Sequence, residues 1–471
     1  MHKQIHQPEK IILGVMAQRY SSDHLPHPRR PLPDSDPEPL DQVASRVLAC
    51  ACDNETMNDP ASDLQARDIL ARLAAKTGLD VHGGRIRRTC SRFCFGVEHG
   101  DYNGTELFGV GTDRFIWLAY RPNDTGRVRV CSANFPSDGV VDFSLGDVPP
   151  PKSTAMADSW ARFPYGVDYI LRREGFKLTR GFDAVLYGNI PGGGMSRSAS
   201  LCLNLLLTFL DVNGIAAPNA PHHMRIVDMA QAVENDYVGS PCGNLDQIMI
   251  YFARAGVGTH YDPKARSIRH VPLGPRAIDF RIVSLDTGTV RPGLEKSIYK
   301  IRRAECAELV ALAGKRFGFS CLADIRDEEQ YLPVIGKYRH SHPHLCARLN
   351  YIYHAQQRLE EIMEAWIAGN IVRVGQLFRQ DGISLRDDYQ ISGPELESMC
   401  DIARSVPGVL GERMLGGGDK GAAGALVRAD SVEALKAAVD KDYPRRHPDL
   451  TEKYAAHVCN MVDGVTVLPG L

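Results

Sequence analysis

Residues 188–202 read Gly-Asn-Ile-Pro-Gly-Gly-Gly-Met-Ser-Arg-Ser-Ala-Ser-Leu-Cys and combine consecutive glycines with closely spaced serines. The apolar residues 182–186 before them predict a strand, and the apolar run 201–210 after them predicts a buried helix. Glycines let backbone N–H groups approach a ligand, and a helix N-terminus adds further donors. The stretch therefore suits an anion such as phosphate, whereas a plain strand-to-helix turn with a serine cap is the alternative.

A second polar cluster follows an apolar segment that contains Arg92. Residues 98–104 read Glu-His-Gly-Asp-Tyr-Asn-Gly and place acidic, imidazole and phenol groups at the end of an expected strand. Such groups can make several directional hydrogen bonds to a polyhydroxylated ligand. The alternative is a polar turn closed by the Asn-Gly dipeptide.

A third candidate is Asp246, in the segment Pro241-Cys-Gly-Asn-Leu-Asp-Gln247. Residues 223–239, which precede this segment, predict a helix with an apolar face. By itself, a carboxylate just after a glycine bend suits a helix N-cap.

The composition is that of an ordinary globular protein. The chain has 471 residues, of which 24% are charged and 44% hydrophobic, and a formal net charge of −2. This charge gives no electrostatic reason to expect nucleic acid as a partner, and no apolar run is long enough to cross a membrane. The 12 cysteines are scattered without a Cys-x-x-Cys pair, which favours reduced, mostly buried thiols and a cytoplasmic location.

The length suggests two domains preceded by an N-terminal extension. Residues 1–45 are rich in proline and charge and predict an extended arm, while residues 62–78 predict a helix. We expect the extension to cover residues 1–80, a first domain residues 81–275 and a second domain residues 276–471.

The three motifs together resemble the galactokinase family of the GHMP small-molecule kinases. Residues 90–104 are similar to that family's signature Gly-Arg-Val-Asn-Leu-Ile-Gly-Glu-His-Thr-Asp-Tyr-Asn-Gly, and residues 241–247 to its Pro-Cys-Gly-Ile-Met-Asp-Gln. Further similarity lies at residues 286–306, 384–396 and 413–422, so the resemblance runs from about residue 85 to the C-terminus. It implies an α+β, two-domain GHMP kinase fold with the active site in the cleft between the domains.

The resemblance also implies the chemistry: ATP-dependent phosphorylation of the anomeric hydroxyl of a sugar, with Mg²⁺. It makes Asp246 the catalytic carboxylate, with Arg92 beside it, and Ser198 and Glu234 the Mg²⁺ ligands. The implied sugar-binding residues are Glu98, His99, Asp101, Tyr102 and Tyr299. The implied ATP-binding residues are Gly192, Gly193, Gly194, Ser196, Arg197 and Ser198.

Several positions depart from the family pattern. Arg197 replaces a serine, Asp286 an asparagine, Leu415 a threonine, and Asp419 and Lys420 a phenylalanine and a glycine. The changes at 197 and 286 suggest a sugar other than galactose, such as a uronic acid, a pentose or a phosphorylated longer-chain sugar. A different class of function is a catalytically inactive regulator that binds ATP and sugar. The sequence identifies no protein partner.

Overall fold

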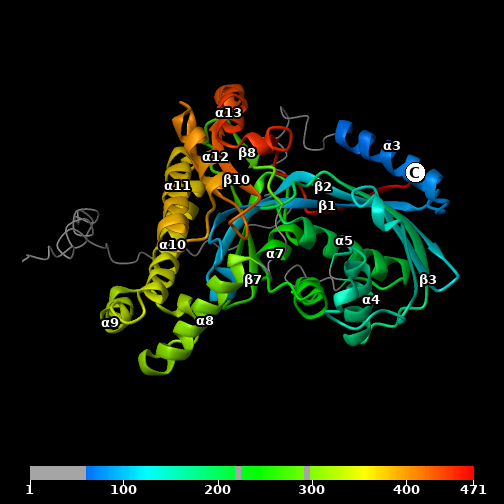
Figure 1. The fold of residues 1–471 in the computed structure, drawn as a ribbon, viewed down its shortest axis with the longest axis horizontal. Helices are drawn as coiled ribbons and strands as arrows, with labels where there is room; N and C mark the ends of the chain where they lie inside the picture. The colour runs from blue at the N-terminus through cyan, green and yellow to red at the C-terminus, as the bar shows by residue number, and fades with distance from the viewer. Residues whose placement is uncertain (1–59, 157, 218–223, 291–296) are drawn as a thin grey trace, which may run out of the picture. The chain divides into compact units, whose positions relative to one another are not determined.

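The computed structural model describes residues 60–156, 158–217, 224–290 and 297–471 (Figure 1). The extended arm predicted for residues 1–45 lies outside the described residues. The helix predicted for residues 62–78 is present as α3 (Pro60–Thr77).

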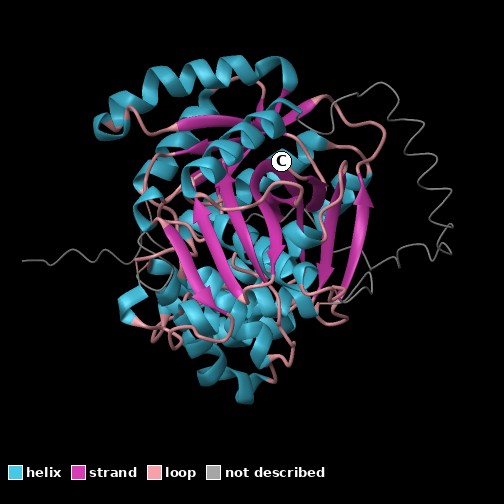
Figure 2. Ribbon diagram, turned by 90° about the vertical axis from the view of Figure 1, so that its right-hand side faces the viewer, coloured by secondary structure: helices cyan, strands magenta, loops and turns pink. Residues whose placement is uncertain are grey.

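The larger of two sheets has eight strands. They are β1 (Arg85–Gly96), β2 (Leu107–Asn123), β3 (Arg127–Ser132), β4 (Val140–Ser144), β5 (Gly181–Gly188), β6 (Val257–Asp262), β7 (Ser267–Pro272) and β12 (Val465–Pro469). The order is β12-β1-β2-β5-β3-β4, with β6 paired to the start of β2 and β7 paired to β6. Figure 2 shows strands side by side with helices above and below them. Only the β3–β5 pair among these is parallel.

Helices cover both faces of this sheet, so β1 is buried along all but its first residue. Figure 1 shows α3 on one side of β1 and β2, and α4 and α5 on the other. The helices of the first half are α4 (Arg162–Arg173), α5 (Arg197–Val212), α6 (Arg225–Ala232) and α7 (Leu245–Tyr251), with a π-helical turn at Val233–Val238. The predicted strand and buried helix around the glycine-rich loop are thus β5 and α5.

The second sheet is antiparallel, with the order β11-β8-β10-β9. Its strands are β8 (Phe280–Asp286), β9 (Val409–Met414), β10 (Ala422–Arg428) and β11 (Ala455–Cys459). The helices of this half are α8 (Ile298–Phe317), α9 (Glu328–Tyr338), α10 (Pro343–Ile367), α11 (Ile371–Asp387), α12 (Pro394–Ser405) and α13 (Val432–Arg446). The chain leaves the larger sheet between β7 and β8, and the division into domains at residue 276 stays a prediction.

Short 3₁₀ turns link these elements. They are Asp101–Asn103, Pro136–Asp138, Thr154–Met156, Leu322–Asp324, Ala429–Ser431 and Pro448–Leu450.

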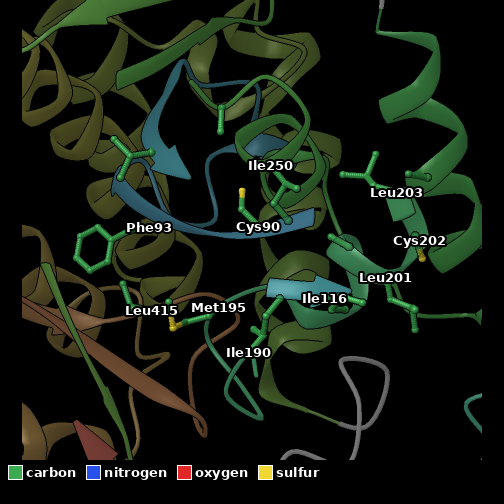
Figure 3. Packing of buried hydrophobic residues seen from close by; sticks show 14 of the residues in the cluster. Cys90, Phe93, Ile116, Ile190, Met195, Leu201, Cys202, Leu203, Ile250 and Leu415 are labelled. Atoms are coloured by element: carbon green, nitrogen blue, oxygen red, sulfur yellow. The ribbon is translucent and has the colours of Figure 1, made fainter. Parts of the chain in front are cut away.

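The hydrophobic core continues from one sheet to the other. Met195, in the loop before α5, and Leu415, just after β9, are fully buried in one cluster with Phe93 of β1 (Figure 3). Leu415 is one of the positions where the chain departs from the family pattern. Its apolar side chain fills the same core as Met195.

Helix α3 is fastened to the larger sheet by one carboxylate. Asp63 accepts hydrogen bonds from Arg88 Nη1 at 2.7 Å and from Trp117 Nε1 at 2.6 Å, on β1 and β2. Arg67 of the same helix donates to the carbonyls of Pro469 and Gly470 after β12. The helical part of the predicted extension is therefore built into the sheet.

We predict that Asp63→Ala lowers the free energy of unfolding by about 2–3 kcal/mol, because it removes the carboxylate that receives two buried donors. Urea denaturation measures this loss. Asp68→Ala on the same helix is the control: its ion pair with Arg72 is exposed, and we expect a change of about 0.5 kcal/mol or less. Equal losses for the two variants would contradict this account of how α3 is held.

Candidate active site

The predicted functional residues gather around one cavity of about 330 Å³. Its walls come from the end of β1, the loop before α5, the start of α7, the start of α8 and the loop after β9. The predicted residues that line it are Arg92, Glu98, His99, Asp101, Gly192, Gly193, Gly194, Ser196, Arg197, Ser198, Glu234, Asp246 and Tyr299. Tyr102 does not line it and lies behind His99, to which it is hydrogen-bonded.

Arg92 and Asp246 form an ion pair at the centre of the cavity wall. The Arg92 side chain is 2% exposed, and its Nε and Nη2 lie 2.8 and 2.7 Å from Asp246 Oδ1. Burial alone lowers the pKa of the guanidinium, but the charges of Asp246 and Glu98 outweigh burial and raise it. Asp246 is about one-third exposed, and no residue in the described ranges bonds its Oδ2. This oxygen is left for a ligand.

Asp246 is not the N-cap of its helix. The cap position of α7 is Asn244, and Asp246 lies in the first turn. Asp101 holds the start of this helix instead, because its Oδ2 accepts the Leu245 N–H at 3.1 Å. Asp101 Oδ1 accepts the Tyr102 N–H at 3.0 Å, so both of its oxygens bind backbone. Burial raises the pKa of Asp101 to about 6, against these hydrogen bonds, which lower it.

Glu98 is also engaged by the protein. Its Oε1 accepts the Gly416 N–H at 3.0 Å and lies 3.2 Å from Arg413 Nη2 and 3.5 Å from Arg92 Nη1. Its backbone carbonyl accepts the hydroxyl of Tyr351 at 2.8 Å. Glu98 therefore joins the end of β1 to the loop after β9.

Aromatic rings surround His99, which has a positive φ of 60°. Tyr299 and Tyr389 lie 5.2 and 5.1 Å from its ring, centroid to centroid. Its Nδ1 is 2.8 Å from the Tyr102 hydroxyl, which is 2.7 Å from the Tyr389 hydroxyl. These contacts fix the orientation of the imidazole at the cavity wall.

The glycine-rich loop before α5 is in close backbone contact with the loop after β9. A Cβ on Gly421 would lie 2.7 Å from the Gly193 backbone, and one on Gly194 would lie 3.0 Å from the backbone of Ala422. Ser196 ends the loop with a positive φ of 65°, immediately before α5 begins at Arg197. The glycines 192–194, Ser196 and the start of α5 line the cavity, and a glycine-rich loop before a helix N-terminus suits phosphate.

Ser198 and Glu234 place two oxygen-bearing side chains on the wall of the cavity. The Ser198 hydroxyl is hydrogen-bonded to the Glu234 carboxylate, whose Oε1 also accepts Gln247 Nε2 at 2.8 Å. Burial raises the pKa of Glu234 to about 7, and these two hydrogen bonds oppose the rise. Within the described ranges, no three acidic, thiol or imidazole side chains gather to hold a metal ion by themselves. Two oxygen ligands fit Mg²⁺ that is also bound by phosphates and water.

The residues that depart from the family pattern have local partners. Lys420 pairs with Glu395 of α12 at 3.0 Å, so its ammonium is bound away from the cavity. Asp286, at the end of β8, accepts the N–H groups of Gly288 and Gly192. The Arg197 guanidinium lies 5.8 Å from the ring of Phe135, and both residues line the cavity. Asp419 has a positive φ of 63° and donates its N–H to the Ile391 carbonyl at 2.7 Å.

One wall of the cavity was not predicted from the sequence. It consists of Asn134, Phe135, Asp158, Ser159, Trp160, Arg162 and Phe163. These residues lie between β3 and the start of α4, outside every motif, and their spacing follows no helical or strand period. The only sequence feature that could have indicated this wall is the presence of aromatic residues in a segment rich in Pro and Asp.

Comparison with known proteins agrees with this geometry. Residues 163–254 match the family model of the GHMP kinases N terminal domain. The galactokinase of Lactococcus lactis subsp. cremoris is 31% identical over 349 residues, which are 74% of this chain and 84% of that protein. The galactokinase of Chloroflexus aurantiacus is 33% identical over 365 residues, which are 77% of this chain and 88% of that protein. The chain belongs to the galactokinase family.

Solved structures agree with this assignment. The Lactococcus lactis galactokinase complexed with galactose superposes with a TM-score of 0.75 at 28% identity, over 85% of this chain and 98% of that one. The mevalonate kinase of Methanococcus jannaschii, at 13% identity and a TM-score of 0.57 over 81% of this chain and 99% of that one, shares the fold. The α+β GHMP kinase fold predicted from the motifs is thus confirmed.

Two general properties of this galactokinase-family chain complete the description. None of the described helices combines the length and the apolar character that crossing a membrane requires. Of the ten cysteines in the described ranges, nine are buried and one is half-buried.

We predict that Glu234→Gln stabilises the ligand-free protein by about 2–3 kcal/mol at about pH 8 and by much less at about pH 5. The carboxyl has a pKa of about 7 in the folded protein and 4.5 as its reference, so the folded state holds the proton more tightly. The free energy of unfolding therefore falls as the pH rises through this window, and the glutamine removes that fall. Urea midpoints at the two pH values test this; an equal gain at both would contradict the burial of a charged Glu234.

Proposed function

We propose that the protein is an ATP-dependent kinase that transfers the γ-phosphoryl group of ATP to the C1 hydroxyl of galactose or a closely similar neutral sugar. The observation that carries the proposal is the Arg92–Asp246 pair beside the glycine-rich loop, because it sets a carboxylate next to a phosphate site. The galactose complex of the Lactococcus lactis relative supports the choice of sugar. We include in the proposal two domains that meet at the cavity and a cytoplasmic location.

In this proposal Asp246 receives the hydroxyl proton of the sugar. A carboxylate that is partly exposed and has an oxygen without a protein partner can accept this proton or orient the hydroxyl for attack. Arg92 pairs with this carboxylate through Nη2 and can balance negative charge that develops beside it. Arg92 Nη1 also donates to the Gly194 carbonyl at 3.0 Å, which ties the pair to the phosphate loop.

The loop 192–196 and the start of α5 bind the ATP phosphates with backbone donors. Ser198 and Glu234 hold Mg²⁺, which when bound neutralises charge on the phosphate oxygens. Glu98, His99, Asp101 and Tyr299 form the sugar side of the cavity. Tyr102 does not line the cavity and acts on the sugar side through its hydrogen bond to His99.

The charges favour a neutral sugar over a uronic acid or a phosphorylated sugar. Of the charged groups that the described residues place at the sugar end, three are the carboxylates of Glu98, Asp101 and Asp246. The cation among them, Arg92, is already shared by Asp246, Glu98 and the Gly194 carbonyl. An additional anionic group on the sugar would face carboxylates without a free counter-charge. The pairing of Asp246 with Arg92 likewise favours an active kinase over a regulator that only binds.

We predict that the protein releases ADP with galactose and not with galacturonate, and that Asp246→Asn lowers kcat by about 100- to 10,000-fold. The amide keeps the shape of the side chain but cannot take the proton. A coupled assay of ADP release measures both effects. Asp236→Asn is the control, because Asp236 is exposed and pairs with Arg173 away from the cavity. A fully active Asp246→Asn would refute the proposed role, and turnover of galacturonate would refute the argument from charge.

We predict that Arg197→Ser raises the KM for ATP about tenfold and changes the KM for galactose less than about twofold, since a charged hydrogen bond is worth about 1.5–3 kcal/mol. The reason is that Arg197 is the first residue of α5, directly after the glycine-rich loop that we assign to the ATP phosphates. Initial rates against each substrate measure the two constants. Arg180→Ser, at an exposed pair with Asp124, is the matched control. A larger effect on galactose than on ATP would place Arg197 in the sugar site.

A further inference from the structure

A row of charges of alternating sign runs from helix α10 to the cavity. Each member lies within 3.5 Å of the next, and the smallest separations are 3.0, 2.6, 3.2, 3.5 and 2.7 Å in order. All but the last have side chains that are 13% exposed or less. In order from α10, the six residues are Arg358, Asp381, Arg413, Glu98, Arg92 and Asp246.

Arg413, on β9, is the third of these six residues, and it does not line the cavity. Its side chain is fully buried, and its guanidinium lies 4.5 Å from the ring of Phe378. Nη1 is 2.6 Å from Asp381 Oδ2, and Nη2 donates to the Cys94 carbonyl at 2.9 Å. A planar guanidinium held at both ends has one orientation, and that orientation places Nη2 3.2 Å from Glu98 Oε1.

Glu98 transmits this orientation to Arg92. One oxygen, Glu98 Oε1, accepts from Arg92 Nη1 and from the Gly416 N–H and also lies 3.2 Å from Arg413 Nη2. Without Arg413, the Glu98 carboxylate would be attracted to Arg92 alone, which is the remaining cation beside it in the described structure. Arg92 uses its Nε and Nη2 for Asp246, so a shift of its guanidinium toward Glu98 would weaken that pair.

We propose that Arg413, anchored by Asp381, is a positioning residue for the phosphoryl transfer: it fixes Glu98 so that Arg92 stays aligned on Asp246. This inference rests on the proposed kinase function. It gives the arginine of the second sheet a part in the reaction although it contacts neither substrate.

The same elements contain a second charge cluster that serves as an internal comparison, in which a buried carboxylate meets two arginines that are about one-third exposed. Glu412, adjacent to Arg413 on β9, pairs with Arg379 of α11 at 2.7 Å and with Arg404 of α12 at 2.8 Å. None of these three residues lines the cavity or contacts Glu98 in the described structure. A variant there disturbs the same strand and helix without touching the row of charges.

The experiment compares Arg413→Lys, Glu98→Gln and the double variant, with Arg379→Lys as the matched control. We expect Arg413→Lys to lower kcat by about 10- to 100-fold, because lysine keeps the charge but cannot hold both Asp381 and Glu98. The KM for ATP should stay within about threefold, because the hydrogen bonds and ion pairs of Arg413 in the described structure involve no residue of the phosphate loop. The double variant should lose no more than the worse single variant, since Arg413 acts through Glu98.

Losses that multiply in the double variant, or a kcat for Arg413→Lys within about twofold of that for Arg379→Lys, would overturn the inference. If Arg413→Lys does not fold, Asp381→Asn replaces it, with the same non-additivity expected against Glu98→Gln. An inactive wild-type protein would instead refute the proposed function.

A crystal structure of Arg413→Lys tests the positioning role separately from the proposed kinase function. We expect the Arg92 Nε–Asp246 Oδ1 distance to lengthen beyond the 2.8 Å of the wild-type protein. An unchanged contact would overturn the positioning role whether or not the wild-type protein phosphorylates galactose.

Discussion

The burial of the Arg92 guanidinium is the constraint on which the rest of the site depends. A charge removed from water must be paired and hydrogen-bonded, or the fold bears a cost of several kcal/mol, roughly. The partners of Arg92 come from three separate segments: Glu98 at the end of its own strand, Gly194 in the phosphate loop and Asp246 in the first turn of α7. Satisfying one arginine therefore brings together a carboxylate for the sugar hydroxyl and the loop for the phosphates. The chemistry follows from this convergence.

The second sheet completes the site by close backbone approach. The loop after β9 lies against the phosphate loop at Gly193, Gly194 and Gly421, where side chains would not fit. This approach also delivers the Gly416 N–H to Glu98. The cost of the arrangement is visible in the raised pKa values of the acids buried here, about 6 for Asp101 and about 7 for Glu234. Such sites trade stability for function, and ligands restore part of the loss.

The sequence predicted the parts of the site that are local in the chain. The glycine-rich loop between β5 and α5 could be recognised because its strand, loop and helix are consecutive, and the motif around Asp246 identified the family. The roles that depend on distant partners could not be predicted. The position of Asp246 is compatible with an N-cap, but Asp101 binds the start of that helix. The motif around Lys420 gives no indication of its ion-pair partner, which is Glu395. The ion pair between Glu98 and Arg413 forms only when the two sheets meet. The segment between β3 and α4 likewise becomes a cavity wall only in the folded structure.

The central claim is that Asp246 and the phosphate loop hold one sugar hydroxyl and the γ-phosphate side by side. A crystal structure of the protein with galactose and a non-hydrolysable ATP analogue tests it most directly. The account predicts the C1 hydroxyl within hydrogen-bond distance of Asp246, about 2.5–3.0 Å, with the analogue's phosphates on residues 192–198. Galactose bound with another hydroxyl at Asp246, or phosphates bound away from that loop, would contradict it.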